Sequence, residues 1–335
     1  VEFDDRLATD TLIVNDVPDV RMLPRLSACL DRVAGESRSR AHIVSTCNFP
    51  IAAGLASSAS SFAALTVAAA AATGGPADTL GLARLAGRAS GSAARSLFGG
   101  FVELSNAGDK IELRELCSPE AWPLQVVVAI TETGPKAVGS TEAMEISRRT
   151  SPFYSDWLSR QEHDLATARE AIAGRDFEKL AAIAEHSCLK MHSVMWASRP
   201  PMVYWNAATM RCLQTVRQLQ AQGIGVFFTI DAGPQVKAVC LPEAAARVEA
   251  ALRATEGVRD VMISGLGEGD VRLGDGRCLH PGRSLVFCQR TRIIAQRNTN
   301  ARLELSYTPR NWRGEFWPPR SKTGFQTTSS AWMHA

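Results

Sequence analysis

The hydrophobic and polar positions of this 335-residue chain predict a protein of mixed helices and strands. Apolar residues that recur every three or four positions indicate helices, whereas short apolar runs between turn residues indicate strands. The run at 124–130 is apolar almost throughout, so we expect a central strand there. The first half predicts strands at 11–14, 41–46, 101–104, 110–113 and 124–130, and helices at 23–34, at 58–72 and after Asp78.

The second half begins with a predicted loop at 131–140 and then becomes mostly helical. This order of elements predicts an α+β fold of two packed domains, at 1–140 and 141–268. The pattern predicts helices at 151–173, 177–191, 203–222 and 242–255, and strands at 226–230, 236–241 and 258–264.

Composition indicates a soluble globular protein, with 45% hydrophobic and 21% charged residues. No stretch has the roughly twenty consecutive apolar residues that a membrane span needs, and the N-terminus lacks a signal-peptide pattern. The eight cysteines form no C-x-x-C pair and, with the six histidines, show no metal-ligand spacing. We therefore expect free thiols in a reducing cytoplasm.

The C-terminal region differs in style from the rest of the chain. From Arg272 to the end, eleven Lys/Arg residues stand against three Asp/Glu residues, among Trp and Pro residues with no regular period. We expect 269–335 to be an atypical, poorly ordered basic tail, resembling a frameshifted or read-through translation. The alternative is a basic extension that binds RNA or an acidic partner.

The small-residue stretch at 48–60 joins a predicted strand to a predicted helix. Gly54 can adopt backbone angles that other residues avoid, so backbone can approach a ligand closely there. The N–H groups at a helix start favour phosphate, and the hydroxyls of Ser57, Ser58 and Ser60 could hold phosphate oxygens or magnesium. The plainer interpretation is a serine-capped helix after a tight loop.

Two further stretches carry candidate chemistry. In Ser-Gly-Ser-Ala-Ala-Arg at 90–95, two hydroxyls and Arg95 can cradle an anion, and arginine grips carboxylates bidentately. The alternative is a helix end with a solvated arginine. Asp231 stands at a strand end before Ala-Gly-Pro, where it is either a turn residue or a catalytic base.

These three stretches resemble the diphosphomevalonate decarboxylases of the GHMP kinase superfamily. Pro-Ile-Ala-Ala-Gly-Leu-Ala-Ser-Ser-Ala matches the superfamily's phosphate loop, Pro-x-x-x-Gly-Leu-x-Ser-Ser-Ala. Ser-Gly-Ser-Ala-Ala-Arg-Ser-Leu-Phe-Gly-Gly-Phe-Val-Glu and Thr-Ile-Asp-Ala-Gly-Pro are similar to two decarboxylase motifs, in the same order. The resemblance, from Asn48 to about Gly265, implies a GHMP kinase fold: a ribosomal protein S5 domain 2-like N-terminal domain and a ferredoxin-like C-terminal domain.

The resemblance also implies the roles of individual residues. Asp231 would act as the catalytic base and Arg95 would hold the substrate carboxylate, while Ser58 would bind magnesium. ATP phosphates would lie on Ala53, Gly54, Leu55, Ala56, Ser57, Ser58 and Ser60. The substrate would contact Ser90, Gly91, Ser92, Arg95, Ser140 and Ala232. His192 is interpreted as a structural histidine between helices.

The activity implied is the ATP-dependent decarboxylation of mevalonate 5-diphosphate to isopentenyl diphosphate, by a cytoplasmic homodimer in isoprenoid biosynthesis. Three alternatives stay open: a phosphomevalonate decarboxylase, a mevalonate 3-kinase, and an inactive fragment that serves as a binding or dimerisation module. The chain departs from the family pattern at Ala94 and Gln235, where the family has Cys and Asn. The family's Lys-Tyr-Trp-Gly-Lys motif is absent, so we expect an N-terminally incomplete domain.

Overall fold

The computed structural model describes residues 1–75, 78–107, 110–269 and 296–298. The chain divides into a unit at Val1–Asn300 and a second unit at Ala301–Ala335, and the second lies wholly outside the described residues. The prediction of a poorly ordered tail at 269–335 likewise falls almost entirely outside them. The fold below is therefore that of the first unit.

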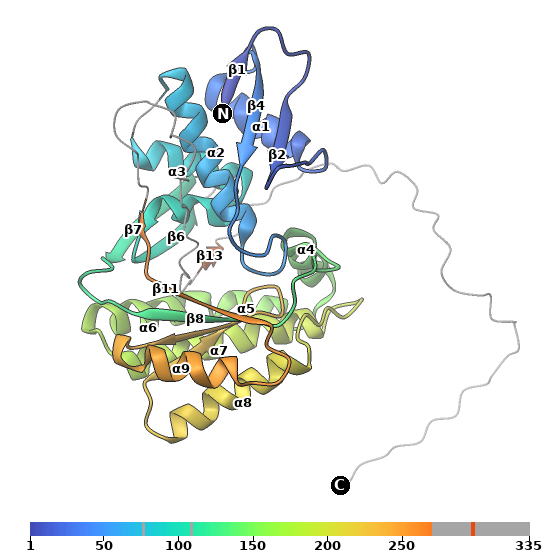
Figure 1. Ribbon diagram of the computed structural model, residues 1–335. Coiled ribbons are helices and arrows are strands. Elements are labelled where there is room, and N and C mark those ends of the chain that lie inside the picture. The colour runs from blue at the N-terminus through green and yellow to red at the C-terminus, as the bar shows by residue number, and fades with distance from the viewer. Residues whose placement is uncertain (76–77, 108–109, 270–295, 299–335) are drawn as a thin grey trace, which may run out of the picture. The chain divides into compact units, whose positions relative to one another are not determined.

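The N-terminal part of the chain forms a mixed four-stranded sheet in the order β1-β4-β2-β3. β2 and β4 are parallel, whereas β1 and β3 run antiparallel to their neighbours. Three helices share a hydrophobic core with this sheet (Figure 1). The elements are β1 (Glu2–Asp4), β2 (Thr11–Val14), β3 (Val17–Pro18), α1 (Leu23–Ala34), β4 (Arg40–Ser45), α2 (Ser57–Thr73) and α3 (Thr79–Ala89).

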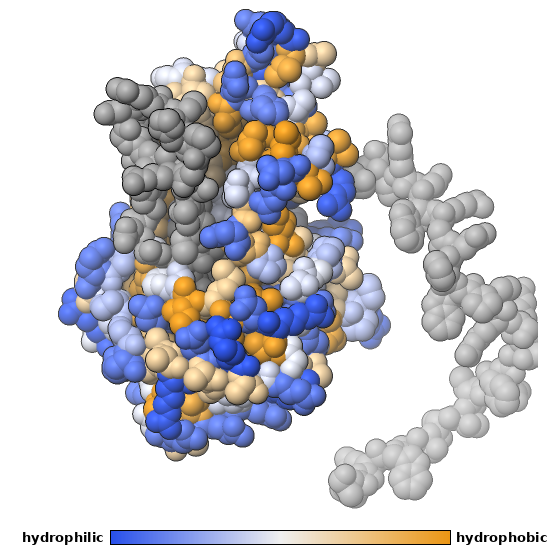
Figure 2. All heavy atoms as spheres, in the orientation of Figure 1, coloured by the Kyte–Doolittle hydropathy of each residue, from blue (hydrophilic) through white to orange (hydrophobic). Residues whose placement is uncertain are grey.

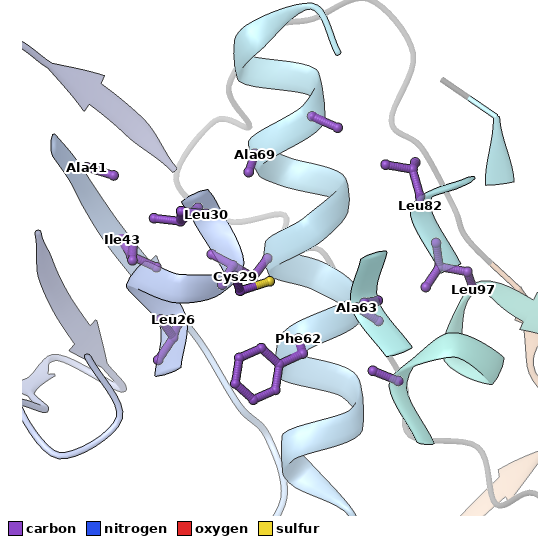
Figure 3. Packing of buried hydrophobic residues seen from close by; sticks show 14 of the residues in the cluster. Leu26, Cys29, Leu30, Ala41, Ile43, Phe62, Ala63, Ala69, Leu82 and Leu97 are labelled. Carbon is purple, nitrogen blue, oxygen red and sulfur yellow. The ribbon is translucent and has the colours of Figure 1, made fainter. Parts of the chain in front are cut away.

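Small side chains allow α2 to lie close to its neighbours in this core. Alanine is the best helix former and leaves little bulk between helices, and Ala63, Ala69 and Ala70 of α2 are buried in one cluster with the leucines of α1. Figure 3 shows Leu26 and Leu30 of α1 and Ile43 of β4 on the side of α2 that carries Phe62. Burying each such side chain contributes about 1.5–3 kcal/mol.

A hairpin of β6 and β7 connects this part to the second sheet. A short 3-10 segment leads into it, and β5 pairs with β12. The elements are η1 (Gly91–Leu97), β5 (Phe98–Gly99), β6 (Phe101–Ala107), β7 (Lys110–Cys117), β12 (Glu268–Gly269) and β13 (Gln296–Asn298), which pairs with β6.

The second sheet is antiparallel and has the strand order β11-β8-β10-β9. Helices lie around it in the lower half of Figure 1. Its strands are β8 (Gln125–Ile130), β9 (Val226–Thr229), β10 (Val236–Cys240) and β11 (Asp260–Gly265). The helices are α4 (Ser140–Thr150), α5 (Tyr154–Ser159), α6 (Gln161–Gly174), α7 (Phe177–Trp196), α8 (Ala207–Ala221), η2 (Pro242–Ala244) and α9 (Ala245–Arg253).

The strand β8 is buried on both faces, which explains its almost continuous apolar sequence. Successive side chains of a strand point to opposite faces. Val127 and Ala129 pack in a core with α8 and α9, whereas Val126 and Val128 pack in a core with α6 and α7. The prediction of a central strand is confirmed, because β8 lies between β11 and β10.

Most predicted elements are present, and the differences have local causes. The sequence pattern predicts no helix at 140–150, where the structure has α4. This helix buries only Ala143 and Ser147, so its sequence carries little apolar signal. The single helix predicted at 151–173 is two helices that meet at Arg160. β8 comes before the domain boundary expected at residue 140 yet pairs within the second sheet, so that sheet begins earlier in the chain.

The surface drawn in Figure 2 mixes hydrophilic residues with smaller hydrophobic patches. Among the described residues, no helix combines the length and apolar character that would let it cross a membrane. The mixed helices and strands confirm the α+β prediction.

Candidate active site

The loop between β4 and α2 has an unusual backbone. Ala52, Gly54 and Ala56 all have positive φ angles, of 60°, 88° and 53°. This region costs a non-glycine L-residue about 1–2 kcal/mol, and such strain concentrates at functional sites. Ala56 is also the N-cap of α2 and provides no side-chain cap, so the first N–H groups of the helix have no capping side chain. The loop therefore presents backbone amides of the kind that bind anions.

The three serines of this loop have different surroundings. The buried Ser57 hydroxyl accepts a hydrogen bond from the amide of Ala52 (3.1 Å), and the Ser60 hydroxyl donates to the carbonyl of Ser57 (3.0 Å). These two hydroxyls hold the loop in shape. Ser58 is half-buried, and within the described residues its hydroxyl makes no hydrogen bond. Ser58 is thus the serine whose hydroxyl is available to a ligand.

The loop touches the Asp231 turn backbone to backbone. A Cβ on Gly54 would lie 2.6 Å from the Cα of Gly233, and one on Gly233 would lie 2.4 Å from the Cα of Gly54. Real Cβ atoms do not approach other atoms this closely, so both positions require glycine. Two stretches separated by about 180 residues, which the sequence had marked independently, are in direct contact.

Gln235 ties the same two segments together. Its buried side chain accepts from the amide of Thr131 (2.7 Å) and donates to the carbonyls of Ala53 (3.1 Å) and Glu132 (2.5 Å). Buried amide groups of this kind need all their partners, because an unpaired one costs about 1–3 kcal/mol. The departure from the family's asparagine therefore lies at a point where three segments are joined.

Residues at the start of α8 hold the Asp231 turn in place. The hydroxyls of Thr131 and Thr209 both donate to the carbonyl of Pro234, at 3.0 and 2.6 Å. Asn206, the N-cap of α8, donates to the Thr131 hydroxyl (3.3 Å) and accepts from the amide of Thr209 (2.8 Å). The turn is thus fixed by the same residues that start the helix.

Asp231 lies beside two lysines. Its side chain is 45% exposed and forms an ion pair with Lys237, whose side chain is 7% exposed. Lys136 donates to the carbonyl of Ala232 (2.7 Å) and to the hydroxyl of Ser140 (2.6 Å), the first residue of α4. Burial lowers the pKa of Lys136, and the charge of Lys237 lowers it further, while the charge of Asp231 opposes this.

The guanidinium of Arg95 is buried, and two of its nitrogens have no hydrogen-bond partner among the described residues. The residue is 4% exposed, and its Nε and one terminal nitrogen make no hydrogen bond within the described residues. Burial lowers the pKa of Arg95 to about 10, and the negative charge of Asp231 acts in the opposite direction. A buried charge left unpaired costs several kcal/mol. These buried nitrogens are therefore suited to an anion.

The residues before Arg95 lie closer to the surface. Ser90 and Ser92 are half-buried and Gly91 is exposed, at the start of η1. The carbonyl of Ser90 accepts from the amide of Ala93 (2.7 Å), which begins the turn that carries Arg95 inward. Ala94, at the family's cysteine position, is completely buried.

His192 lies behind the Asp231 turn in α7. It is completely buried, and its Nε2 lies 3.2 Å from the carbonyl oxygen of Ile230 and 3.3 Å from the indole nitrogen of Trp205. Burial lowers the pKa of His192 to about 4, although the Ile230 carbonyl and the charge of Asp231 favour its protonation. This is the structural placement predicted for His192.

Sequence reasoning missed the roles of Lys136, Lys237 and Gln235. Lys237 carried a usable signal, because it interrupts the otherwise apolar strand at 236–240, and lysine is almost never fully buried unless it is paired. Among the described residues, no group of three or more His, Cys, Asp or Glu side chains could hold a metal ion.

Comparisons with known proteins identify the family of this chain. The family description "Diphosphomevalonate decarboxylase-like N-terminal domain" matches residues 1–113, and "Mevalonate 5-diphosphate decarboxylase C-terminal domain" matches residues 126–263. The diphosphomevalonate decarboxylase of Eremothecium gossypii is 31% identical over 280 residues, which cover 76% of this chain and 70% of that protein.

Two further relatives extend the comparison. The diphosphomevalonate decarboxylase of Candida albicans is 36% identical over 59% of this chain and 56% of its own length, so the chain spans little more than half of that relative. The solved structure "MDDEF in complex with MVAPP, AMPPCP and Magnesium" has a TM-score of 0.72 and 31% identity, and the match covers 80% of this chain and 84% of that one. The GHMP kinase fold is thereby shown, and the chain belongs to the diphosphomevalonate decarboxylase family.

Proposed function

We propose that this chain catalyses the ATP-dependent decarboxylation of mevalonate 5-diphosphate to isopentenyl diphosphate, in the mevalonate pathway of isoprenoid biosynthesis. This proposal is carried by the buried guanidinium of Arg95, which has two nitrogens without a hydrogen bond to any described residue and lies within electrostatic reach of Asp231. The substrate carboxylate is an anion of the right kind for Arg95, since guanidinium groups bind carboxylates bidentately. We also propose that the protein acts in the cytoplasm as a homodimer.

The phosphate loop supplies the proposed ATP site. Its backbone at Ala53–Ser60 combines a helix N-terminus with glycine and alanine residues at positive φ, so amide groups rather than side chains would hold the phosphates. Lys136, whose amide donates to the carbonyl of Ala52 (3.2 Å), places a cation beside this loop. Binding of the ATP analogue AMPPCP by the solved relative supports the assignment.

Magnesium fits this site as a companion of the phosphates. Magnesium usually keeps several waters and is bound through one or two protein oxygens together with substrate phosphates. The hydroxyl of Ser58 at the helix start, which bonds to none of the described residues, meets that requirement. When bound, the ion would neutralise phosphate charge. The magnesium in the solved relative supports this proposal.

The remaining residues divide the chemistry among them. Asp231 would accept or orient the proton of the substrate's tertiary 3-hydroxyl while ATP phosphorylates the hydroxyl oxygen. Departure of that phosphate would develop positive charge at C3, and the carboxylate would then leave as carbon dioxide, its bonding electrons forming the new double bond. Arg95 would hold the carboxylate in line, with Ser90, Gly91, Ser92, Ser140 and Ala232 around the substrate.

The test is an assay of the 335-residue chain with ATP, magnesium and mevalonate 5-diphosphate, which follows carbon dioxide and ADP together. We expect both products in equal amounts. Mevalonate 5-phosphate and mevalonate, supplied separately, distinguish the two related enzymes: decarboxylation of the monophosphate alone, or ADP without carbon dioxide, would replace the proposed function. If the protein binds ATP but forms neither carbon dioxide nor ADP with any of the three substrates, a binding module would be favoured.

Substitution of the proposed base checks the same assignment. We expect Asp231→Ala to lower turnover by at least about 10²-fold, the usual scale for a positioned acid or base. Nucleotide affinity should change little, because ATP would bind on the other loop. Titration with AMPPCP measures that affinity, and unchanged turnover in Asp231→Ala would remove Asp231 from the mechanism.

A further inference from the structure

Lys237 occupies a position where a lysine needs a specific partner. It lies in β10, between Val128 of β8 and Thr229 of β9, and 5% of its surface is exposed. Every residue of β10 is buried, and the other four are apolar. Removing an ammonium group from water costs several kcal/mol unless an anion compensates it. In the described part of the chain, the carboxylate of Asp231 provides that anion.

The three cations near Asp231 have different connections. Arg95 has two buried nitrogens that bond to none of the described residues, and Lys136 donates hydrogen bonds to Ser140 and to the carbonyl of Ala232. Lys237 is the one that contacts the Asp231 carboxylate, through Oδ2. Arg95 is therefore available to a ligand and Lys136 connects two loops, whereas Lys237 binds the Asp231 carboxylate directly.

The backbone on each side of Asp231 is already fixed without Lys237. The amide of Ile230 donates to the sulfur of Cys188 (3.2 Å), and His192 lies against the carbonyl of the same residue. The amide of Gly233 donates to the carbonyl of Asp231 (2.7 Å). What these contacts leave free is rotation of the Asp231 side chain, which is half-exposed.

We propose that Lys237 is a positioning residue that holds the Oδ2 atom of Asp231, so that Oδ1 is directed to the substrate hydroxyl. This inference rests on the proposed function and deepens it. Lys237 touches neither substrate nor ATP in this assignment. It acts through Asp231, by keeping one orientation of the carboxylate on the end of a half-exposed turn.

The first experiment compares Lys237→Met with the wild-type chain in the decarboxylation assay. We expect kcat to fall about 10- to 100-fold, the scale of a misplaced catalytic group. The KM for ATP should stay within about twofold of the wild-type value, because Lys237 does not contact ATP and its loss removes no ATP-binding interaction. Lys237→Arg restores a cation at the same place and should recover part of the loss.

A double substitution separates positioning from general damage. If Lys237 acts through Asp231, adding Lys237→Met to Asp231→Asn should cost no further turnover, because the group it positions is already gone. An additional loss of the same size as in the single variant would overturn the proposal, since Lys237 would then act independently of Asp231.

Lys190 provides the matched control. It forms an ion pair with Asp164 between α7 and α6, and both side chains are mostly buried. Lys190→Met removes the same kind of pair away from the site. We expect it to lower the melting temperature while kcat stays unchanged. Equal losses of kcat in both variants would show that Lys237 is merely structural.

A structural measurement decides the question independently of activity. Crystal structures of wild-type and Lys237→Met chains should show one Asp231 orientation in the first and a displaced or split carboxylate in the second. An unmoved carboxylate would overturn the proposal. If the wild-type chain lacks turnover, the proposed function fails, but this comparison, with Lys237→Arg as the folded reference, still tests the role of Lys237.

Discussion

The phosphate loop and the Asp231 turn lie against each other but are built in opposite ways. The loop owes its shape to its own residues. It has three positive φ angles, small side chains, and hydrogen bonds between serine hydroxyls and residues nearby in the sequence. The turn owes its shape to side chains from distant elements. The first arrangement leaves amides free to bind a ligand, and the second fixes the direction of one carboxylate.

This difference determines what each region tolerates. Added bulk is the main danger for the loop, because its backbone passes close to another backbone at Gly233. The turn is instead sensitive to changes in polar partners, because buried groups that lose a hydrogen bond are not rehydrated. The substitutions below test either the loop or the turn.

The largest effect is expected at Gly54. Gly54→Ala combines a positive φ of 88° with a Cβ that would meet the Cα of Gly233 at 2.6 Å. The backbone penalty and the overpacking together should cost roughly 3–5 kcal/mol in the free energy of unfolding. Urea denaturation measures the change, and AMPPCP titration should show loss of nucleotide binding in any folded fraction.

Gly174 is the matched control for that substitution. It ends α6, its φ is not positive, and nothing lies within 4 Å of an added Cβ. Gly174→Ala should therefore be neutral or stabilise the protein by up to about 1 kcal/mol. A loss at Gly54 no larger than that at Gly174 would contradict the close contact between the two backbones.

The next effect is a pH dependence from His192, behind the turn. Burial lowers its pKa to about 4 in the folded chain, whereas an unfolded histidine has a pKa near 6.5. Between these values the unfolded state binds the proton more readily, so stability falls as pH falls from about 6.5 to about 4. The full loss is on the order of 3 kcal/mol.

Substitution isolates this contribution. Denaturant unfolding of His192→Gln at several pH values should give a shallower slope between pH 4.5 and 6.5 than the wild-type chain. His186 lies six residues earlier on the same helix with its side chain exposed, so His186→Gln is the control for replacing a histidine of this helix outside the core. A slope that persists in His192→Gln would assign the titration to other groups.

The smallest effects separate two neighbouring serines. Ser57→Ala removes the acceptor of the Ala52 amide and should cost about 1 kcal/mol of stability. Ser58→Ala removes a hydroxyl with no described partner, so stability should hold while affinity for magnesium and AMPPCP falls several-fold. Melting curves with and without ligand distinguish the two. The opposite assignment of effects would exchange their roles.

Local sequence signals predicted much of the fold. α1 spans 23–34 as predicted, with Pro24 near its start and Gly35 after its end, and Asp78 caps α3 by accepting from the amide of Gly81 (2.6 Å). These features depend on residues close in sequence. α4 was missed because only Ala143 and Ser147 are buried in it, so its apolar signal in the sequence is short.

The sequence indicated those parts of the candidate site whose residues are contiguous in the chain. The phosphate loop, the stretch around Arg95 and the Asp231 turn each have a recognisable pattern. The connections between them do not, because Gln235 and Lys237 act through contacts with residues that the fold alone brings near. Gln235 looked like a weakened match in the sequence, yet its longer side chain joins Ala53 to the second sheet.

One buried leucine makes the phosphate loop part of a shared core. Leu55 packs with Phe101 of the hairpin and with Val126 and Val239 of the second sheet. Because that cluster joins the loop and the hairpin to α6, α7 and the second sheet, these parts should melt together in one cooperative transition. Free energy gained by binding ATP at the loop would then stabilise the distant strands as well, through mass action on the whole folded state.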